Sequence, residues 1–203
     1  KKKKRPVKTE QTVPAKNNRA QSSQLSIDEI IRRGDAAYDE KKYTEALEWY
    51  LKAAERGSAE GQFVVATFYH LHSIPEIPND YDKAEKWYRK AAEQGHRQAQ
   101  NNLGEMYHHG HGTKRDYAEA AKWFRKSADQ GNARGEYLIG YMYDYGIGIK
   151  EDIVEAIKWY RKAAIHGYTS AMITLGAKYE SGKRIKRNKA EALKWYWTAA
   201  EYG

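Results

Sequence analysis

Apolar side chains recur along this chain of 203 residues with a period of about 36. Tryptophan stands at five evenly spaced positions, Trp49, Trp87, Trp123, Trp159 and Trp195. Each Trp is followed at once by Tyr or Phe and eight residues later by Gly. An Ala lies three residues before each Trp, and in four units another lies four residues after it. This i, i+3, i+7 spacing marks one face of a helix, and its register over five units predicts a helical repeat protein.

The second helix of each unit is predicted from the residues at its ends. The expected N-caps are Asp80, Asp116, Asp152 and Asn188, whose side-chain oxygens can accept a backbone N–H. Glu119, Glu155 and Glu191 follow three of these caps at the spacing of a capping box. The Gly eight residues after each Trp is expected to end the helix in the left-handed conformation.

The first helix of a unit carries an aliphatic residue, a small residue and a Tyr, as in Leu103, Gly104 and Tyr107. Gly104, Gly140 and Gly176 share the small position, where a neighbouring helix can approach closely because no side chain intervenes. The four prolines lie at positions 6, 14, 75 and 78, so none interrupts a predicted helix.

The formal net charge of +9 is unevenly distributed. Residues 1–25 hold eight Lys or Arg and one acid, a net charge of +7, whereas residues 26–203 hold 28 bases and 26 acids, a net charge of +2. Because residues 1–25 also contain few apolar side chains, they are predicted to form a disordered basic tail or linker. The absence of Cys excludes a disulfide framework, a Cys-ligated zinc finger and a thiol nucleophile.

One unit contains Leu103-Gly104-x-x-Tyr107, Gly110-x-Gly112, Ala120-x-x-Trp123-Phe124-x-Lys126-x-Ala128 and Gly131. The unit at 137–172 repeats this pattern, which resembles the Sel1-like repeat family. Residues 58–203 comprise four such units, of which two depart from it. The unit at 63–95 lacks both loop glycines, and the last unit has Arg184 in place of the second. Residues 26–57 resemble a tetratricopeptide repeat instead, since 12 residues separate Gly34 from Ala46.

The resemblance implies an all-α fold, a right-handed α-α superhelical solenoid of antiparallel helix pairs with one tetratricopeptide-like and four Sel1-like repeats. Neighbouring units must stack, because one repeat cannot bury its own apolar face. In such a solenoid the first helices line a concave groove and the second helices form the convex back.

By analogy with the tetratricopeptide register, the groove positions are Asp28, Ile31, Asp35, Tyr38, Glu60, Phe63, Thr67, His70, Gln98, Asn101, Glu105, His108, Arg134, Tyr137, Tyr141, Asp144, Ser170, Ile173, Ala177 and Glu180. All but Asp28, Ile31, Thr67, Gln98, Ser170, Ile173 and Ala177 are taken as residues that contact a peptide. The groove positions include six acids and one base, together with aromatic rings. This composition favours a basic or amphipathic polypeptide as partner. The alternative is that these are merely solvated, variable helix positions.

The position two after each Trp holds Leu51, Arg89, Arg125, Arg161 and Trp197. An apolar Trp197 on the terminal helix is expected to pack on a further C-terminal segment or a partner chain, or else to be a tolerated surface Trp. The histidines His70, His108, His109 and His111 form a weak candidate for a zinc or nickel site, since their spacing is not that of a known ligand set. No cofactor is predicted.

The sequence contains no nucleophile elbow, phosphate loop, zinc-protease helix or dinucleotide fingerprint, so it predicts a non-enzymatic interaction scaffold or adaptor. The alternative is a nucleic-acid-associated helical repeat protein that uses the basic tail and the cluster Lys183, Arg184, Lys186, Arg187 and Lys189. Against it, an acidic groove repels phosphate. Residues 1–7 resemble either a nuclear-import signal or the basic flank of an upstream membrane anchor.

Overall fold

A computed structural model describes residues 25–71 and 74–202, and every helix or strand assigned within them is an α-helix. The helices are α2 (Ile27–Asp39), α3 (Tyr43–Glu55), α4 (Ala59–His70), α5 (Tyr81–Glu93), α6 (Arg97–His109), α7 (Tyr117–Asp129), α8 (Ala133–Tyr145), α9 (Ile153–Ile165), α10 (Thr169–Ser181) and α11 (Lys189–Tyr202). The predictions for the basic tail and for the cap at Gly203 concern residues outside the described part.

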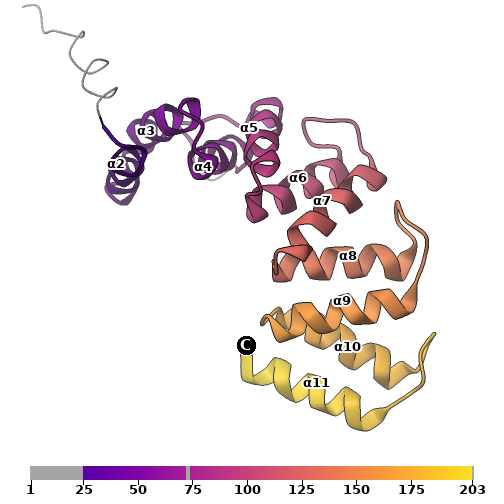
Figure 1. Cartoon of the computed structure of the whole chain (residues 1–203). Helices are drawn as coiled ribbons and strands as arrows, with labels where there is room; N and C mark the ends of the chain where they lie inside the picture. The colour runs from indigo at the N-terminus through magenta and orange to yellow at the C-terminus, as the bar shows by residue number, and fades with distance from the viewer. Residues whose placement is uncertain (1–24, 72–73, 203) are drawn as a thin grey trace, which may run out of the picture.

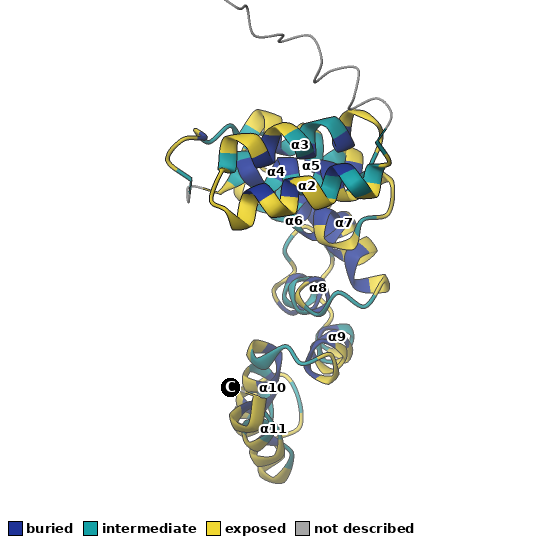
Figure 2. Ribbon diagram, turned by 90° about the vertical axis from the view of Figure 1, so that its left-hand side faces the viewer, coloured by how far each residue is buried: buried dark blue, intermediate teal, exposed yellow. Residues whose placement is uncertain are grey.

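The helices form five antiparallel hairpins that stack side by side into a curved array (Figure 1). Extensive contacts join only helices that follow each other in the sequence. Seen from the side in Figure 2, the buried positions face neighbouring helices and the exposed positions face outward. The predicted all-α solenoid is therefore confirmed.

Each hairpin of the last four units is closed by the same pair of interactions. The side chains of Asp80, Asp116, Asp152 and Asn188 accept backbone N–H groups from the first turns of α5, α7, α9 and α11. Their own backbone N–H groups donate 2.9 Å hydrogen bonds to the carbonyl oxygens of Tyr69, Tyr107, Tyr143 and Tyr179. The cap and the last turn of the preceding helix thus satisfy each other's free backbone groups.

The predicted capping boxes are only half formed: the cap side chains accept backbone N–H groups as expected, but the prediction that the Glu side chains bind the cap N–H groups is wrong. Glu119 and Glu155 pair with Lys122 and Lys158 of their own helices, and Glu191 accepts a hydrogen bond from Trp195. These carboxylates are not needed at the caps, because the Tyr carbonyl of the first helix already accepts the cap N–H. The expected left-handed glycines are confirmed at 57, 95, 131 and 167, where φ lies between 73° and 90°.

Close approach of the two helices in a hairpin depends on the small residue of the first helix. A Cβ atom at Gly104 would lie 2.7 Å from the Phe124 ring, and one at Gly176 would lie 2.5 Å from the Tyr196 ring. Such contacts are shorter than carbon atoms tolerate, so the aromatic residue after each Trp occupies the space that the glycine leaves. The sequence prediction for this position is confirmed.

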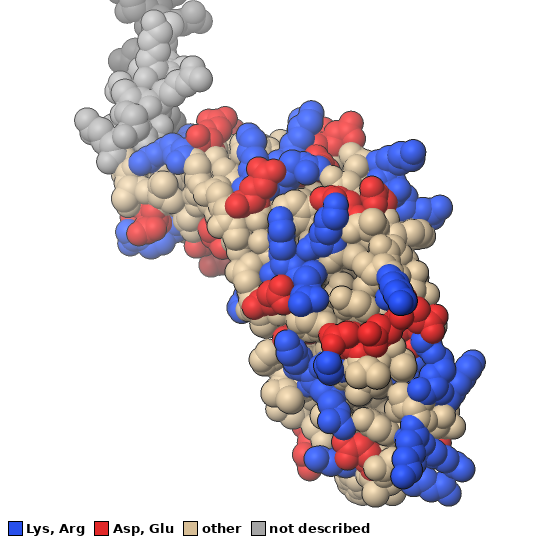
Figure 3. Space-filling model, turned by 45° about the vertical axis from the view of Figure 1, so that its right-hand side comes forward, with Lys and Arg blue, Asp and Glu red and all other residues tan. Residues whose placement is uncertain are grey.

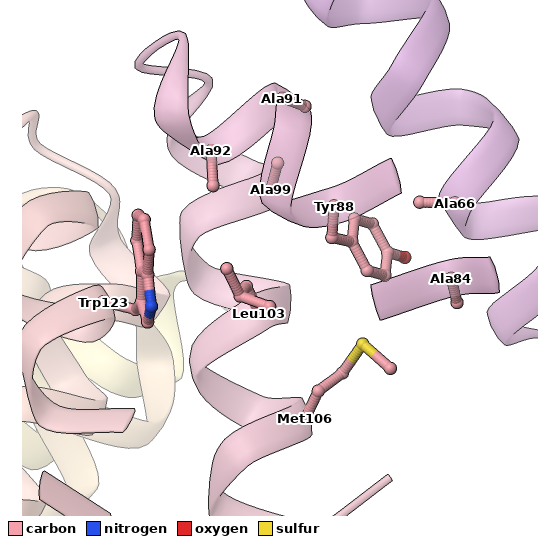
Figure 4. Close-up of a cluster of buried hydrophobic side chains, with 9 residues drawn as sticks. All are labelled: Ala66, Ala84, Tyr88, Ala91, Ala92, Ala99, Leu103, Met106 and Trp123. Atoms are coloured by element: carbon pink, nitrogen blue, oxygen red, sulfur yellow. The ribbon is translucent and has the colours of Figure 1, made fainter. Parts of the chain in front are cut away.

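The core of the described residues consists of four clusters, each of which draws buried side chains from two neighbouring units. Figure 4 shows one part of it, in which Leu103 of α6 lies between Tyr88 of α5 and Trp123 of α7. Tyr88 and Leu103 are almost completely buried, at 1% and 0% exposure. Because a single cluster draws side chains from four successive helices, α4 to α7, no unit buries its apolar face alone.

The arginines two positions after Trp connect each unit to the next. The guanidinium groups of Arg89, Arg125 and Arg161 donate hydrogen bonds to the hydroxyls of Tyr107, Tyr143 and Tyr179, each 18 residues further on. The first unit replaces this polar contact with Leu51, which packs in the core cluster that also includes Tyr69. The last unit has Trp197 at this position.

Candidate functional site

Three hollows lie on the surface formed by the first helices of the units, here called the first-helix face. The N-terminal hollow has a volume of about 230 Å³. It is lined by Tyr38, Tyr50, Phe63, Val64, Thr67, Phe68, Leu71 and Ile74. The exposed fractions of Tyr38 and Leu71 are 47% and 50%, so this hollow presents apolar and aromatic surface to solvent.

The middle hollow has a volume of about 280 Å³ and a mixed lining. It is lined by Glu105, His108, His109, Phe124, Arg134, Tyr137, Leu138, Tyr141 and Met142. Arg134 donates to the Glu105 carboxylate at 2.9 Å across the unit boundary, and the Asn101 amide donates to the same carboxylate at 2.7 Å. Burial nevertheless raises the pKa of Glu105 above its ordinary value. Burial, together with His109 and Arg115, lowers the pKa of His108.

The C-terminal hollow is the largest of the three, at about 490 Å³, and its charged residues are all cationic. It is lined by Tyr145, Ile173, Thr174, Ala177, Lys178, Ser181, Lys183 and Arg184. Figure 3 shows Lys and Arg side chains gathered at the lower right, at the C-terminal end of the array, and acids and bases intermixed over much of the rest of the visible surface.

Most of the acids predicted to make the groove negative have partners within the protein. The hydroxyls of Tyr50 and Tyr196 donate to Asp35 and Glu180, at 2.6 and 2.9 Å. Glu60 lies 3.1 Å from the imidazole of His96. These three carboxylates are hydrogen-bonded within the protein and keep their negative charge, whereas Glu105 and Asp144 are each paired with a cation of a neighbouring unit.

Asp144 departs most from its expected role. It is completely buried, at 0% exposure, and its carboxylate lies 2.5 Å from the Lys178 ammonium and 3.1 Å from the Arg184 guanidinium. The Tyr160 hydroxyl donates a third contact, at 3.2 Å. Asn101 is likewise buried, at 2% exposure. Because both side chains are buried, neither can contact a partner that binds to this surface.

Seven of the remaining predicted contact residues line hollows of the first-helix face, and their contact with a peptide stays a prediction. Tyr38, Phe63, Glu105, His108, Arg134, Tyr137 and Tyr141 line the N-terminal and middle hollows. His70 lies next to them, with its Nδ1 atom 3.4 Å from the Tyr88 hydroxyl. Ile173 and Ala177, which were groove positions but not predicted contacts, line the C-terminal hollow.

The weak metal candidate has the geometry of a ring stack. The imidazole of His111 stacks on Tyr81 at 4.8 Å and on His109 at 5.5 Å, measured between ring centroids, and His108 lies edge-on to His109 at 4.8 Å. Within residues 25–71 and 74–202, no group of three or more His, Cys, Asp or Glu side chains is arranged to hold a metal ion. These contacts give the histidines a packing role at the corner between two units.

Trp197 is 70% exposed on α11, and Leu193, one turn earlier, is 59% exposed. In the inner units the residues equivalent to Leu193 are buried or half-buried, because the next first helix covers them. The terminal helix thus presents the same face without a cover inside the described chain.

Sequence reasoning named Lys183 and Arg184 only as part of a basic loop cluster and missed Lys178 of the C-terminal hollow. Lys178 is not a groove position in the tetratricopeptide register, yet it ion-pairs with Asp144, 34 residues earlier. The feature of the sequence that could have pointed to this hollow is Arg184, which replaces a motif glycine. Leu71 and Tyr145 follow or end first helices and were likewise outside the predicted register.

The stacked hairpins and their first-helix face define an α-solenoid of the class that presents a surface to other proteins. Four consecutive segments, 59–96, 97–132, 133–168 and 169–201, match the Sel1 repeat, and residues 31–60 match a tetratricopeptide repeat. The chain belongs to the Sel1 repeat family. Proteins of this family generally act as scaffolds for protein–protein interaction, and their fold is typically non-catalytic.

Solved structures agree with this assignment. The chain is 35% identical to a protective antigen present in uropathogenic Escherichia coli strains, with a TM-score of 0.82 over 94% of this chain and 41% of that one. It is 34% identical to a Sel1 repeat protein from Oxalobacter formigenes, with a TM-score of 0.78 over 88% of this chain and 74% of that one. This chain therefore spans less than half the length of the first of these relatives.

A more distant likeness shows the fold alone. The immunity protein Pa5087 from Pseudomonas aeruginosa is 21% identical, with a TM-score of 0.57 over 89% of this chain and 69% of that one. No curated protein matches the chain. In the part of the chain that the structure describes, no helix is both long and apolar enough to cross a membrane.

Proposed function

We propose that this chain is a non-enzymatic scaffold that binds an amphipathic polypeptide along its first-helix face. The observation that carries the proposal is the row of three hollows, which are lined by residues of successive first helices. A row of hollows suits an extended or helical polypeptide, because each hollow can receive one large side chain.

The chemistry of the partner follows from the hollows more than from the number of acids. The N-terminal hollow favours a large apolar or aromatic side chain, since none of its lining residues within 25–71 and 74–202 is charged. Asp28, Asp35 and Asp39 on α2 are exposed, and Glu60 on α4 is also exposed. Basic side chains next to an apolar anchor would complement these acids. An amphipathic partner with some basic residues therefore suits this half of the face.

The test begins with a random dodecapeptide library selected against the whole chain. The selected peptides are then measured by fluorescence anisotropy against Leu71→Ser and Tyr145→Ser, which remove exposed apolar side chains from two hollows. Val154→Ser and Ile165→Ser are the matched controls, because these residues are 62% and 73% exposed and do not line the three hollows. We expect at least one hollow variant to weaken binding about tenfold and both controls to leave it within twofold.

Two outcomes would refute this function. Equal binding by all four variants would place the peptides elsewhere on the molecule. A labelled single-stranded RNA that binds more tightly than every selected peptide at 150 mM salt would instead favour the nucleic-acid alternative.

A further inference from the structure

Arg184 occupies a backbone conformation that its side chain disfavours. Its φ angle is 71°, in the left-handed region, and it stands where the two preceding units have Gly112 and Gly148, with φ angles of 64° and 69°. A Cβ atom at either glycine would collide with the backbone of Tyr81 or Tyr117 in the preceding unit. Arg184 carries a side chain at this position, so the last hairpin loop holds a Cβ atom where the inner loops have none. Strained positions of this kind often mark functional sites.

The strain is held in place by contacts that fix the Arg184 side chain. Its guanidinium donates to the backbone carbonyl of Asp144 at 2.6 Å and to the carboxylate of Asp144 at 3.1 Å, and it also pairs with Glu151. Lys178 is fixed by the same carboxylate, with only 17% of its side chain exposed. Two cations are thus positioned in advance, which lowers the entropy lost when they bind a ligand.

The charges around the C-terminal hollow do not balance. Three cations line it, namely Lys178, Lys183 and Arg184, and none of the lining residues is acidic. Buried Asp144 can neutralise one positive charge. Glu151 neutralises a second only in part, because 58% of its side chain is exposed and water screens its charge. A positive excess therefore remains at a hollow with cations held in fixed positions.

The rest of the lining is apolar or weakly polar. Ile173, of which 51% is exposed, and Ala177 come from α10, and the ring of Tyr145 lies 5.5 Å from the Lys178 ammonium. An acidic side chain complements this lining, because its short aliphatic stem can contact the apolar residues while its carboxylate contacts the cations. A C-terminal carboxylate can contact the same cations. Arg and Lys are the residues that bind carboxylates with charge-assisted hydrogen bonds.

We propose that the C-terminal hollow binds a carboxylate of the polypeptide that lies along the first-helix face. This inference rests on the proposed function and adds a polarity to it. An apolar anchor of the partner occupies the hollow at Tyr38 and Leu71, and an acidic group occupies the hollow at Lys183 and Arg184. The nucleic-acid alternative uses the same cations for phosphate and is separated by the test below.

The test compares two lysines of one loop. Lys183→Gln and Lys186→Gln change the net charge equally and both residues are exposed, but only Lys183 lines the hollow. Peptides from the dodecapeptide selection against the whole chain are measured by anisotropy at 50 and 300 mM NaCl. We expect an excess of Asp and Glu in the selected pool, binding about tenfold weaker with Lys183→Gln, and a change below twofold with Lys186→Gln.

Exchanging the acidic residue of the peptide for its amide distinguishes the ligand group. If a side-chain carboxylate binds, Asp→Asn or Glu→Gln in the peptide weakens binding to wild type about tenfold and has little effect on Lys183→Gln. If the C-terminal carboxylate binds, amidating the peptide has that effect instead. Both results support the proposal.

Three results would overturn it. One is a pool without acidic enrichment whose binding still depends on Leu71, which would leave the proposed function intact and refute only the carboxylate site. The second is an equal effect of Lys183→Gln and Lys186→Gln, which would indicate diffuse attraction. The third is a labelled RNA that displaces the peptides and loses about tenfold in affinity with Lys183→Gln, since the hollow would then bind phosphate.

Discussion

The hydroxyl of Tyr160 donates a 3.2 Å hydrogen bond to the carboxylate of Asp144, the buried acid that also pairs with Lys178 and Arg184. The contact joins the two helices of one hairpin, and the ion pairs join that hairpin to the next. Burial next to this carboxylate raises the pKa of Tyr160, so the phenol stays protonated as a donor. Asp144 is thus a structural centre of the last two units.

Asp144→Asn is therefore expected to destabilise the protein by about 2–3 kcal/mol, because two partly buried cations lose their counter-charge. The melting temperature should fall by roughly 5–10 °C. Tyr160→Phe removes one neutral donor and should cost only about 1 kcal/mol. Thermal unfolding followed by circular dichroism measures both, and equal losses for the two variants would contradict this assignment.

The small residue of the first helix offers a second prediction. Gly104→Ala should destabilise by about 1–3 kcal/mol despite the higher helix propensity of Ala, because Phe124 is 1% exposed and cannot move away. Gly176→Ala should cost less, since its neighbour Tyr196 is only half-buried. Urea titrations of the two variants test the order. A stabilised Gly104→Ala protein would show that the helices can separate without loss.

A ladder of side-chain pairs connects successive units, and one pair differs in chemistry. Gln94 donates to Gln62 at 2.8 Å and Gln130 donates to Gln100 at 2.7 Å, whereas the equivalent residues His166 and Glu136 lie 2.7 Å apart. Replacing both by Gln should restore the amide pair and keep stability within about 0.5 kcal/mol of wild type.

The single variant Glu136→Ala removes one partner and opens a gap at a residue that is 1% exposed. It should cost about 1–3 kcal/mol. A double variant as unstable as Glu136→Ala would mean that the imidazole makes a contact that Gln cannot replace.

The pH dependence of stability should report on Glu105. Burial raises its pKa from the ordinary value of 4.5, although Arg134 and Asn101 act in the opposite direction. The folded protein therefore holds this proton more tightly than the unfolded chain does. Its favourable contribution is complete at pH values below the unfolded pKa and is lost as the pH rises through the folded pKa.

Glu105→Gln removes this titration and leaves Asn101 an acceptor. We expect the variant to be more stable than wild type at pH 7 and to lose that advantage at about pH 4. Arg134→Gln should have the opposite effect at pH 7, because it leaves the carboxylate without its cation. Melting temperatures at several pH values test this, and a pH-independent difference would contradict it.

The fold could be predicted from the sequence because the repeat places the same chemistry at the same position five times. The caps at Asp80 and Asp116 and the glycine at 104 are local signals of this kind. The pairing of Asp144 with Lys178 and Arg184 was not predictable in the same way, because it crosses between units and depends on distances. Counting acids by position made the groove appear more negative than it is. Arg184 was visible in the sequence as a departure from the motif. Its contacts with Asp144 and Glu151 could be seen only in the three-dimensional structure.

The extensive contacts between helices join sequence neighbours, and this has a mechanical consequence. A small change of tilt at one interface between helices adds to the changes at the other interfaces. The curvature of the whole array is therefore the sum of many small angles. A ligand that reaches from Tyr38 to Arg184 would span several of these interfaces at once. Its binding would select one curvature from the range that the unbound solenoid adopts.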